Sequence, residues 1–345
     1  MSSTVLNTLF VQTQGSYLHL ESDTVRLDVE GQVKTRIPLH HLSGITVFGQ
    51  VMLSPFLIGR CAQDGRDITW LSRSGRFQGR LYGPVSGNVL LRRAQHQALS
   101  SEDATLEIAK RFVAGKLQNA RGTLLRAARE ANETGDESAL REAARSHASA
   151  ITLLRDCSSL DELRGVEGIT AKAYFAAFTS LVRTNRTDFT FNGRSKRPPR
   201  DPINAILSFT YALLTGDCVA ALEGVGLDPQ VGFLHVLRPG RPALALDLME
   251  EFRSSLADRL VLTLINRGQI TRSDFDERTG GAWSLNETGR KTVLIAYQKR
   301  KQEEITHPVT DRTIPISLVP HIQARLLARH IRGELETYPP FIPKV

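Results

Sequence analysis

Three carboxylates lie close together in the segment 246–253: Asp247, Glu250 and Glu251. Residues three or four apart on a helix occupy neighbouring positions on its surface, so Asp247 can share a face with either glutamate. An imidazole, His235, ends a short apolar run before them, and a turn containing Pro, Gly and Arg separates the two. Carboxylate oxygens and an imidazole nitrogen suit a divalent metal ion such as Mn²⁺ or Mg²⁺.

The same spacing has a purely structural explanation. Asp247 could lie in the first turn of a helix, where its charge favours the helix dipole, while Glu250 and Glu251 face the solvent. Read alone, the segment favours this structural explanation, because short motifs often match by chance. Other segments must therefore decide between a metal site and an ordinary helix start.

Glu167 is a second candidate, because it lies between Gly165 and Gly168 in a segment with a helical pattern. A glycine inside a helix costs roughly 1 kcal/mol relative to alanine. The close approach of a backbone, an ion or a phosphate would justify that cost. Alternatively, the helix begins near Gly168 and Glu167 only favours its dipole.

A run of cations without an intervening acid precedes Asp201, and it comprises Arg194, Lys196, Arg197 and Arg200. Such a loop can close over a phosphodiester backbone, or it can be a solvated linker. We expect it to be mobile before DNA binds, because it is polar, cationic and interrupted by prolines. Three further arginines flank the carboxylate segment and can either neutralise it or bind phosphates: Arg238, Arg241 and Arg253.

The elements that must position these residues fall into two parts. Alternating or short apolar runs in the first eighty or so residues predict β-strands, and Ser54-Pro55 opens a predicted short helix. Helical spacing dominates from residue 105 onward. Helices are predicted over 105–129, 139–154, 161–182, 202–222, 243–266, 287–305 and 317–337.

This pattern predicts an α+β fold with two domains. We expect a small N-terminal β-domain over 1–83, a short linker over 84–95, and a larger all-α catalytic domain over 96–345. The N-terminal part carries no catalytic signature. The residues that could do chemistry all lie in the helical part.

Composition narrows the function classes. The 345 residues are 41% hydrophobic and 23% charged, as in an ordinary soluble protein, and the net charge of +8 permits nucleic-acid binding. Three cysteines without a CxxC pair argue against a disulfide framework and suit a reducing cytosol. We see no signal peptide and no uninterrupted apolar run of membrane-spanning length. We therefore expect a cytoplasmic protein that does not insert into a membrane.

Four motifs occur in order along the chain. They are Gly-Val-Glu-Gly-x-x-Ala-x-x-Tyr-Phe (165–175), Asp-Pro-x-Asn-Ala-x-Leu-Ser-Phe-x-Tyr-Ala-Leu-Leu (201–214), Gly-Phe-Leu-His (232–235) and Leu-Asp-Leu-Met-Glu-Glu-Phe-Arg (246–253). Each is weak alone, but their order and spacing are specific. Together they resemble the CRISPR adaptation integrase family, the spacer-acquisition nuclease of bacterial and archaeal immune systems. The resemblance covers essentially the whole chain, since that family also has a β N-terminal and a helical C-terminal domain.

The resemblance implies a metal site and assigns its ligands. Glu167, His235 and Glu250 match the family's metal ligands and would be the catalytic residues. Many relatives have aspartate where Glu250 stands, and glutamate is longer by one methylene. Asp247 would support the site, and Glu251 is assigned to structure or solvent. Three residues at other motif positions are expected to pack or to support the site: Tyr174, Asn204 and Tyr211.

The resemblance also implies a reaction and partners. The 3′-hydroxyl of a protospacer end would attack a phosphodiester at the repeat boundary by transesterification, with Mn²⁺ or Mg²⁺ bound, and the same site would act on branched DNA. The family works as a homodimer with a small ferredoxin-like adaptation subunit, which the β-domain would help to dock.

Two other function classes remain as alternatives. One is a non-catalytic architectural DNA-binding protein with a structural acidic cluster. The other, a hydrolase of small phosphoesters, is disfavoured by the basic loop and by the absence of a phosphate-cradling glycine loop.

Overall fold

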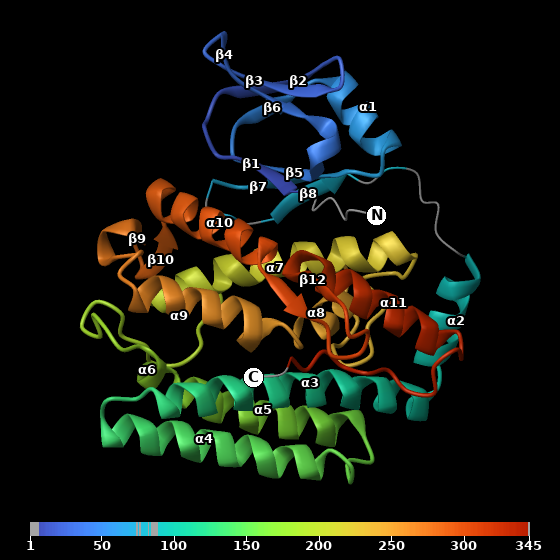
Figure 1. Ribbon diagram of the computed structural model, residues 1–345, viewed down its shortest axis with the longest axis vertical. Coiled ribbons are helices and arrows are strands. Elements are labelled where there is room, and N and C mark those ends of the chain that lie inside the picture. The colour runs from blue at the N-terminus through green and yellow to red at the C-terminus, as the bar shows by residue number, and fades with distance from the viewer. Residues whose placement is uncertain (1–6, 74, 76, 82, 84–88, 344–345) are drawn as a thin grey trace. The chain divides into compact units, whose positions relative to one another are not determined.

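The computed structural model describes residues 7–73, 75, 77–81, 83 and 89–343 (Figure 1). It divides into two compact units, one of Met1–Ser86 with Leu285–Gln302 and one of Gly87–Ser284 with Glu303–Val345. The first is rich in strands and the second is mostly helical, which confirms the predicted α+β class. Of the expected linker 84–95, residues 84–88 lie outside the described residues, and the rest belongs to helix α2 (Val89–Leu99).

The described part of the first unit contains two four-stranded sheets, with the strand orders β1-β5-β7-β8 and β4-β3-β2-β6. The strands are β1 (Asn7–Val11), β2 (Ser16–Glu21), β3 (Thr24–Val29), β4 (Gln32–Pro38), β5 (Leu42–Phe48), β6 (Val51–Leu53), β7 (Asp67–Leu71) and β8 (Phe77–Leu81). Alternation in β2 and β3 buries Leu18 and Val25 in one apolar core with Ile45 and Ile68.

Helix α1 (Pro55–Gln63) begins as its sequence predicts. The Ser54 hydroxyl accepts a hydrogen bond from the Leu57 N–H at 3.2 Å, and Pro55 occupies the first turn.

Helix α10 (Glu287–Gln302) groups with the first unit, although its sequence pattern placed it in the helical domain. Its Gln298 side chain donates to the Thr8 carbonyl at 3.4 Å, and Arg290 Nε donates to Gln12 Oε1 at 3.4 Å. These partners are about 280 residues away along the chain, so local periodicity carries no sign of them.

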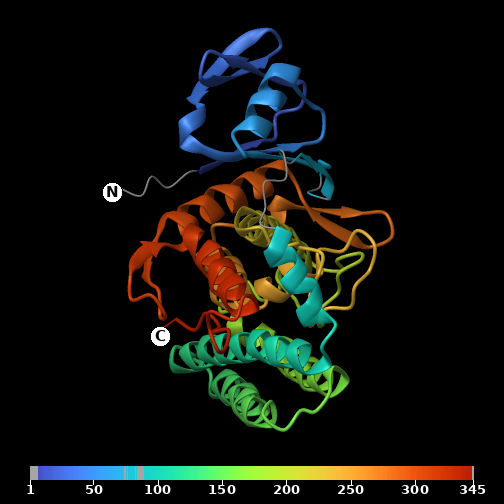
Figure 2. The same ribbon diagram turned by 90° about the vertical axis from the view of Figure 1, so that its right-hand side faces the viewer.

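The helical unit contains the predicted long helices. They are α3 (Glu102–Arg129), α4 (Thr134–Leu153), α5 (Leu160–Ala176), the short α6 (Phe178–Leu181), α7 (Pro202–Val225), α8 (Ala243–Met249), α9 (Arg259–Asn266) and α11 (Val319–Ile331). Figures 1 and 2 both show α3 and α4 side by side, and α5 packs against both. Three helices brought together in this way can present side chains to one site from separate parts of the chain.

Helix α7 forms much of the core of this unit. Asp201 caps its first turn by accepting from the Asn204 N–H at 2.7 Å, and Gly226 ends it in the left-handed conformation. By length and composition alone α7 could cross a membrane, but 67% of its apolar window is buried inside the unit. Burial in a protein core accounts for its apolar character.

The prediction of one continuous helix over 243–266 was wrong. Helix α8 ends at Met249, a turn follows, and a π-helical turn (Arg253–Asp258) leads into α9.

Two short ribbons were also not predicted. They are β9 (Phe275–Arg278) with β10 (Ala282–Leu285), and β11 (Glu304–Thr306) with β12 (Thr313–Pro315). The predicted helix 287–305 therefore ends at Gln302, before β11.

Candidate active site

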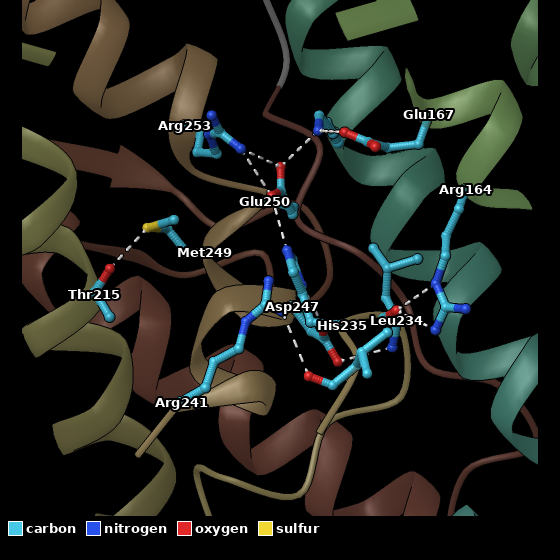
Figure 3. Close-up of polar contacts among 12 residues, drawn as sticks. Arg164, Glu167, Thr215, Leu234, His235, Arg241, Asp247, Met249, Glu250 and Arg253 are labelled. Carbon is cyan, nitrogen blue, oxygen red and sulfur yellow. Dashed lines mark hydrogen bonds and ion pairs between the residues drawn. The ribbon is translucent and has the colours of Figure 1, made fainter. Parts of the chain in front are cut away.

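Glu167, His235 and Glu250 approach one another from three elements of the helical unit (Figure 3). Glu167 lies within α5, His235 lies in the loop between α7 and α8, and Glu250 directly follows α8. His235 Nε2 is 3.9 Å from Glu250 Oε1. Lys116, from α3, links the two glutamates: its ammonium pairs with Glu167 Oε1 and lies 2.9 Å from Glu250 Oε2. A single cation thus connects the two glutamates that the sequence marks as ligands.

Within the described ranges, no three His, Cys, Asp or Glu side chains are grouped closely enough to hold a metal ion as they stand. The ammonium of Lys116 lies between the two glutamates, and of these two the ring of His235 approaches Glu250, at 3.9 Å. The ligand roles of these residues therefore stay predictions.

Asp247 fixes the position of His235. Its Oδ1 accepts from the His235 ring Nδ1 at 2.6 Å and from the His235 N–H at 3.0 Å. Its Oδ2 accepts from the N–H groups of Phe233 and Leu234 at 2.6 and 3.0 Å. Nδ1 is thus engaged with a buried carboxylate, and Nε2 is the ring nitrogen that faces Glu250.

This arrangement rules out the structural explanation for the segment. Asp247 lies in the last turn of α8 rather than the first, and Asp247, Glu250 and Glu251 are all buried. None of the three faces the solvent as that explanation required.

Gly232 lets the histidine loop reach Asp247. A Cβ at this position would lie 2.6 Å from the Ala243 carbonyl carbon and 2.8 Å from Asp247 Oδ2. Arg164 then ties the loop to α5, because its Nε and Nη2 both donate to the Leu234 carbonyl, at 3.0 and 2.9 Å. The helix that carries Glu167 and the loop that carries His235 are thus held together directly.

The structure decides two of the explanations considered for the two glycines beside Glu167, and the approach of an ion or a phosphate stays a prediction. Helix α5 begins at Leu160, so Glu167 lies well inside it and the helix does not begin near Gly168. A Cβ at Gly165 or Gly168 would meet nothing within 4 Å, so among the described residues no other segment packs against them at that distance. They leave an open helix surface beside Glu167.

Glu250 is a buried carboxylate held between cations. Arg253 Nη1 donates to its two oxygens at 2.8 and 3.1 Å, and Lys116 contacts it from the other side. Burial would raise the pKa of Glu250, but the charges of Arg253 and Lys116 outweigh it and hold the pKa well below its usual range. Glu250 is therefore ionised at neutral pH, as a metal ligand must be.

Two tyrosines contact the ends of the π-helical turn, Tyr211 at Arg253 and both tyrosines at Asp258. The Arg253 guanidinium lies 4.6 Å from the ring centroid of Tyr211. The hydroxyls of Tyr211 and Tyr174 donate to the two oxygens of Asp258, at 2.5 and 2.9 Å. Burial raises the pKa of Asp258 despite these donors. The π-helical turn between Arg253 and Asp258 brings both residues to the same tyrosine.

Glu251 is equally buried but belongs to a different environment. It accepts from the Tyr338 hydroxyl at 2.6 Å, from Gln323 Nε2 at 2.9 Å and from the Phe341 N–H at 2.7 Å. Burial raises the pKa of Glu251 to about 7. Of the two expected roles, structure and solvent, it has the structural one, because it anchors the segment 338–341.

Asn204 organises the start of the cationic loop. Its Oδ1 accepts from Arg194 Nη1 at 2.6 Å and from the Ser195 N–H at 2.9 Å, and its Nδ2 donates to the Gly193 carbonyl at 2.8 Å. Arg194 also donates to Ser208 Oγ at 3.0 Å, and burial lowers its pKa. Arg194 therefore anchors the loop, and DNA contact by its guanidinium stays a prediction.

The other expected DNA-binding residues lie at the surface or beside it. Arg200 donates to the Gly280 carbonyl at 2.6 Å, and Arg241 contacts the Val236 carbonyl at 3.5 Å. Lys196, Arg197 and Arg238 are exposed. Arg253 is committed to Glu250. Mobility of the loop stays a prediction.

A pocket of about 660 Å³ opens beside the glutamates. Its polar lining includes Lys116, Glu167, Arg194, Lys196, Tyr211 and Arg253. Cations around a concave space suit a phosphate group. The pocket therefore places phosphate-binding chemistry next to the carboxylates.

The sequence motifs missed Lys116, Arg164 and Asp258. The available signal for Lys116 was its place on the buried face of α3, four residues after Phe112 and three before Asn119. A lysine on an apolar stripe needs a buried partner. Nothing local distinguished Arg164 or Asp258 from surface charges.

The comparisons with known proteins agree over almost the whole chain. The family model described as CRISPR associated protein Cas1 matches residues 9–299. A curated relative from Moorella thermoacetica, CRISPR-associated endonuclease Cas1 1, is 55% identical over 98% of each chain. A Cas1 protein structure from Thermotoga maritima is 25% identical over 95% of this chain and 97% of its own, with a TM-score of 0.81. A casposase bound to integration product has the same fold, with a TM-score of 0.81 at 24% identity over 97% of this chain and 93% of its own. The chain therefore belongs to the CRISPR-associated Cas1 protein family.

Proposed function

We propose that this protein is a divalent-metal-dependent DNA endonuclease and integrase of CRISPR spacer acquisition. The observation that carries the proposal is the approach of Glu167, His235 and Glu250 from separate elements, with the two glutamates sharing one cation. The endonuclease name of the Moorella relative and the integration product bound by the casposase support the reaction class.

The residues present fit a Mn²⁺ or Mg²⁺ ion. Glu250 is ionised, Glu167 already binds a positive charge, and His235 turns an imidazole nitrogen toward Glu250. Two carboxylates with one imidazole suit both ions, and the nitrogen favours Mn²⁺. Glu167, His235 and Glu250 would hold the ion.

In the reaction, the 3′-hydroxyl of a protospacer end attacks a phosphodiester of the repeat. One P–O bond forms and another breaks, so strand transfer needs no energy source. When bound, the metal ion would polarise the phosphodiester and stabilise the leaving oxygen.

The protein's own residues position the site. Asp247 holds His235 in place, Arg253 keeps Glu250 oriented, and the cations of the adjacent pocket bind the phosphates of the reacting strand. Hydrolysis of branched DNA would use the same groups, with water in place of the hydroxyl.

The test is strand transfer of a labelled protospacer into a plasmid that carries the repeat, with Mn²⁺ and with EDTA. We expect Glu167→Ala, His235→Ala and Glu250→Ala each to reduce joining by more than about 100-fold, beyond the loss typical of residues that only support a metal site. Glu107→Ala is the control, because this exposed carboxylate on α3 pairs only with Lys110 among the described contacts. Full joining by all three purified site variants would refute the proposal.

A specific observation favours a second candidate, an architectural DNA-binding protein. Lys116 and Arg253 already neutralise the two glutamates, so the cluster could stabilise the fold without metal. Metal dependence distinguishes the two functions. If neither EDTA nor Mn²⁺ changes joining or cleavage while DNA still binds, the architectural function is the correct one.

The expected partners are DNA and protein. We propose that the chain binds protospacer, repeat and branched DNA, forms a homodimer, and joins a small ferredoxin-like adaptation subunit in the cytosol. The sheet unit, which carries no candidate catalytic residue, would serve these protein contacts. Co-purification of the two subunits, lost on deletion of the sheet unit from the full chain, would support this assignment.

A further inference from the structure

Lys116 occupies an unusual position for a lysine. Its ammonium is paired with Glu167 of α5 and lies 2.9 Å from Glu250 after α8, while its own backbone belongs to α3. The side chain is only 13% exposed. One cation therefore links the three elements that bound the candidate site.

The two glutamates differ in their other partners. Glu250 is also paired with Arg253, so it keeps a counter-ion if Lys116 leaves. For Glu167, Lys116 is the one ion-pair partner found among the described residues. A divalent ion that binds both glutamates must therefore compete with Lys116 for the same oxygen atoms.

Charge repulsion makes joint occupancy unfavourable. A divalent ion and an ammonium held at the same carboxylates would lie within a few ångströms of each other in a partly buried site. Neutralisation by a single lysine is compatible with the carboxylates only while no stronger cation is bound. The position between Glu167 and Glu250 is thus arranged for either Lys116 or a divalent ion, while Arg253 stays paired with Glu250.

The surroundings give Lys116 room to leave. Its side chain lines the pocket of about 660 Å³ together with Arg194 and Lys196. Lysine carries a compact charge on a flexible four-carbon chain, so it can move without a change in the backbone of α3.

We propose that Lys116 is an internal counter-ion that occupies the carboxylates of the metal-free site and is displaced when a divalent cation binds. It stabilises the metal-free protein and lowers the apparent affinity for metal. This inference rests on the proposed function, because it takes Glu167 and Glu250 as the metal ligands.

The experiment titrates Mn²⁺ into the full-length wild type and into Lys116→Met and Lys116→Gln, with free Mn²⁺ followed by electron paramagnetic resonance. We expect both variants to bind Mn²⁺ roughly tenfold more tightly than the wild type, the ratio for loss of a competing ion pair of ordinary strength. In EDTA their thermal midpoints should lie below that of the wild type. Saturating Mn²⁺ should reduce this difference.

Lys110→Met is the matched control, because Lys110 lies on the same helix and pairs with the exposed Glu107. It should change neither Mn²⁺ affinity nor the midpoint in EDTA. Equal or weaker Mn²⁺ binding by the Lys116 variants would overturn the inference and leave the metal site standing. If neither wild type nor variant binds Mn²⁺, the metal site itself is refuted, and the inference with it.

Discussion

Two adjacent glutamates in this protein have opposite chemistry. Glu250 and Glu251 are both buried, and both follow helix α8 in the same turn. Glu250 meets the cations Arg253 and Lys116, which hold its pKa well below the usual range. Glu251 meets a phenol, an amide and a backbone N–H, and burial raises its pKa to about 7.

The difference shows that burial alone does not decide the charge of a carboxylate. Hydrogen bonds from neutral donors offset only part of the free-energy cost of burying an ionised carboxylate, whereas a nearby cation offsets that cost. The Glu250 side of the turn is therefore suited to bind a metal ion, and the Glu251 side is suited to hold the C-terminal segment. Each of the following changes is designed to break or sharpen this contrast.

The largest effect is expected from replacing each of the two glutamates separately by uncharged glutamine. Glu250→Gln should lower strand transfer by roughly 1000-fold, a loss larger than that seen for residues that support a metal site. Glu251→Gln should leave strand transfer within about threefold and cost about 1 kcal/mol of stability, because glutamine can still accept one set of hydrogen bonds and donate to Tyr338. Joining assays and denaturant unfolding measure the two quantities.

Both variants keep the size and shape of the side chain, so each serves as the control for the other. Equal losses of strand transfer in the two would contradict the division of roles between these neighbours.

The sequence marked candidates on the Glu250 side but could not name the partners of Glu251. Glu250, Glu167 and His235 occupy motif positions, so their residue types in order were sufficient to mark them as candidates. Glu251 is defined by partners such as Phe341, which lies 90 residues further along the chain. Helical spacing reports only neighbours three or four residues apart and contains no information about such contacts.

The same limit applies to Lys116 and to the break after α8. Lys116 reaches Glu167 across 51 residues, and the apolar spacing over 243–266 continues through the turn before Arg253 without marking it. The fold class was predictable because alternation and helical spacing are local properties. The grouping of α10 with the sheets was not, because it depends on contacts with β1.

The second prediction concerns pH, where the two glutamates should act with opposite signs. Glu251 binds a proton more tightly when folded than when unfolded, so its contribution is complete below pH 4.5 and is lost as the pH rises through about 7. The loss should be about 3 kcal/mol, because the pKa rises from 4.5 to about 7 on folding. Glu250 has a lowered pKa, so its contribution is present above pH 4.5 and is lost as the pH falls.

Unfolding free energies of the metal-free protein between pH 5 and 8 measure this contrast. Glu251→Gln should flatten the decline that the wild type shows over this range. An unchanged slope in the variant would mean that Glu251 is ionised throughout, and that its neutral donors stabilise the charge as well as cations do.

The smallest effect is expected from Tyr211, whose ring contacts the Arg253 guanidinium. This prediction tests how Arg253 is kept beside Glu250. Tyr211→Phe removes the hydroxyl that donates to Asp258 but keeps the ring 4.6 Å from the Arg253 guanidinium. We expect a stability loss of about 1.5 kcal/mol, typical of a hydrogen bond to an acidic group, and strand transfer within about threefold of the wild type. Tyr174→Phe is the matched control, because its hydroxyl donates to the other oxygen of the same aspartate.

Tyr211→Leu should lower strand transfer further, because it also removes the ring that contacts the guanidinium paired with Glu250. If Tyr211→Phe instead reduces strand transfer as much as Glu250→Gln does, the hydroxyl takes part in the site directly. The pair of Arg253 and Glu250 would then depend on a neutral hydroxyl donor as well as on charge. Glu250 and Glu251 would in that case differ in their pKa values but not in their dependence on neutral donors.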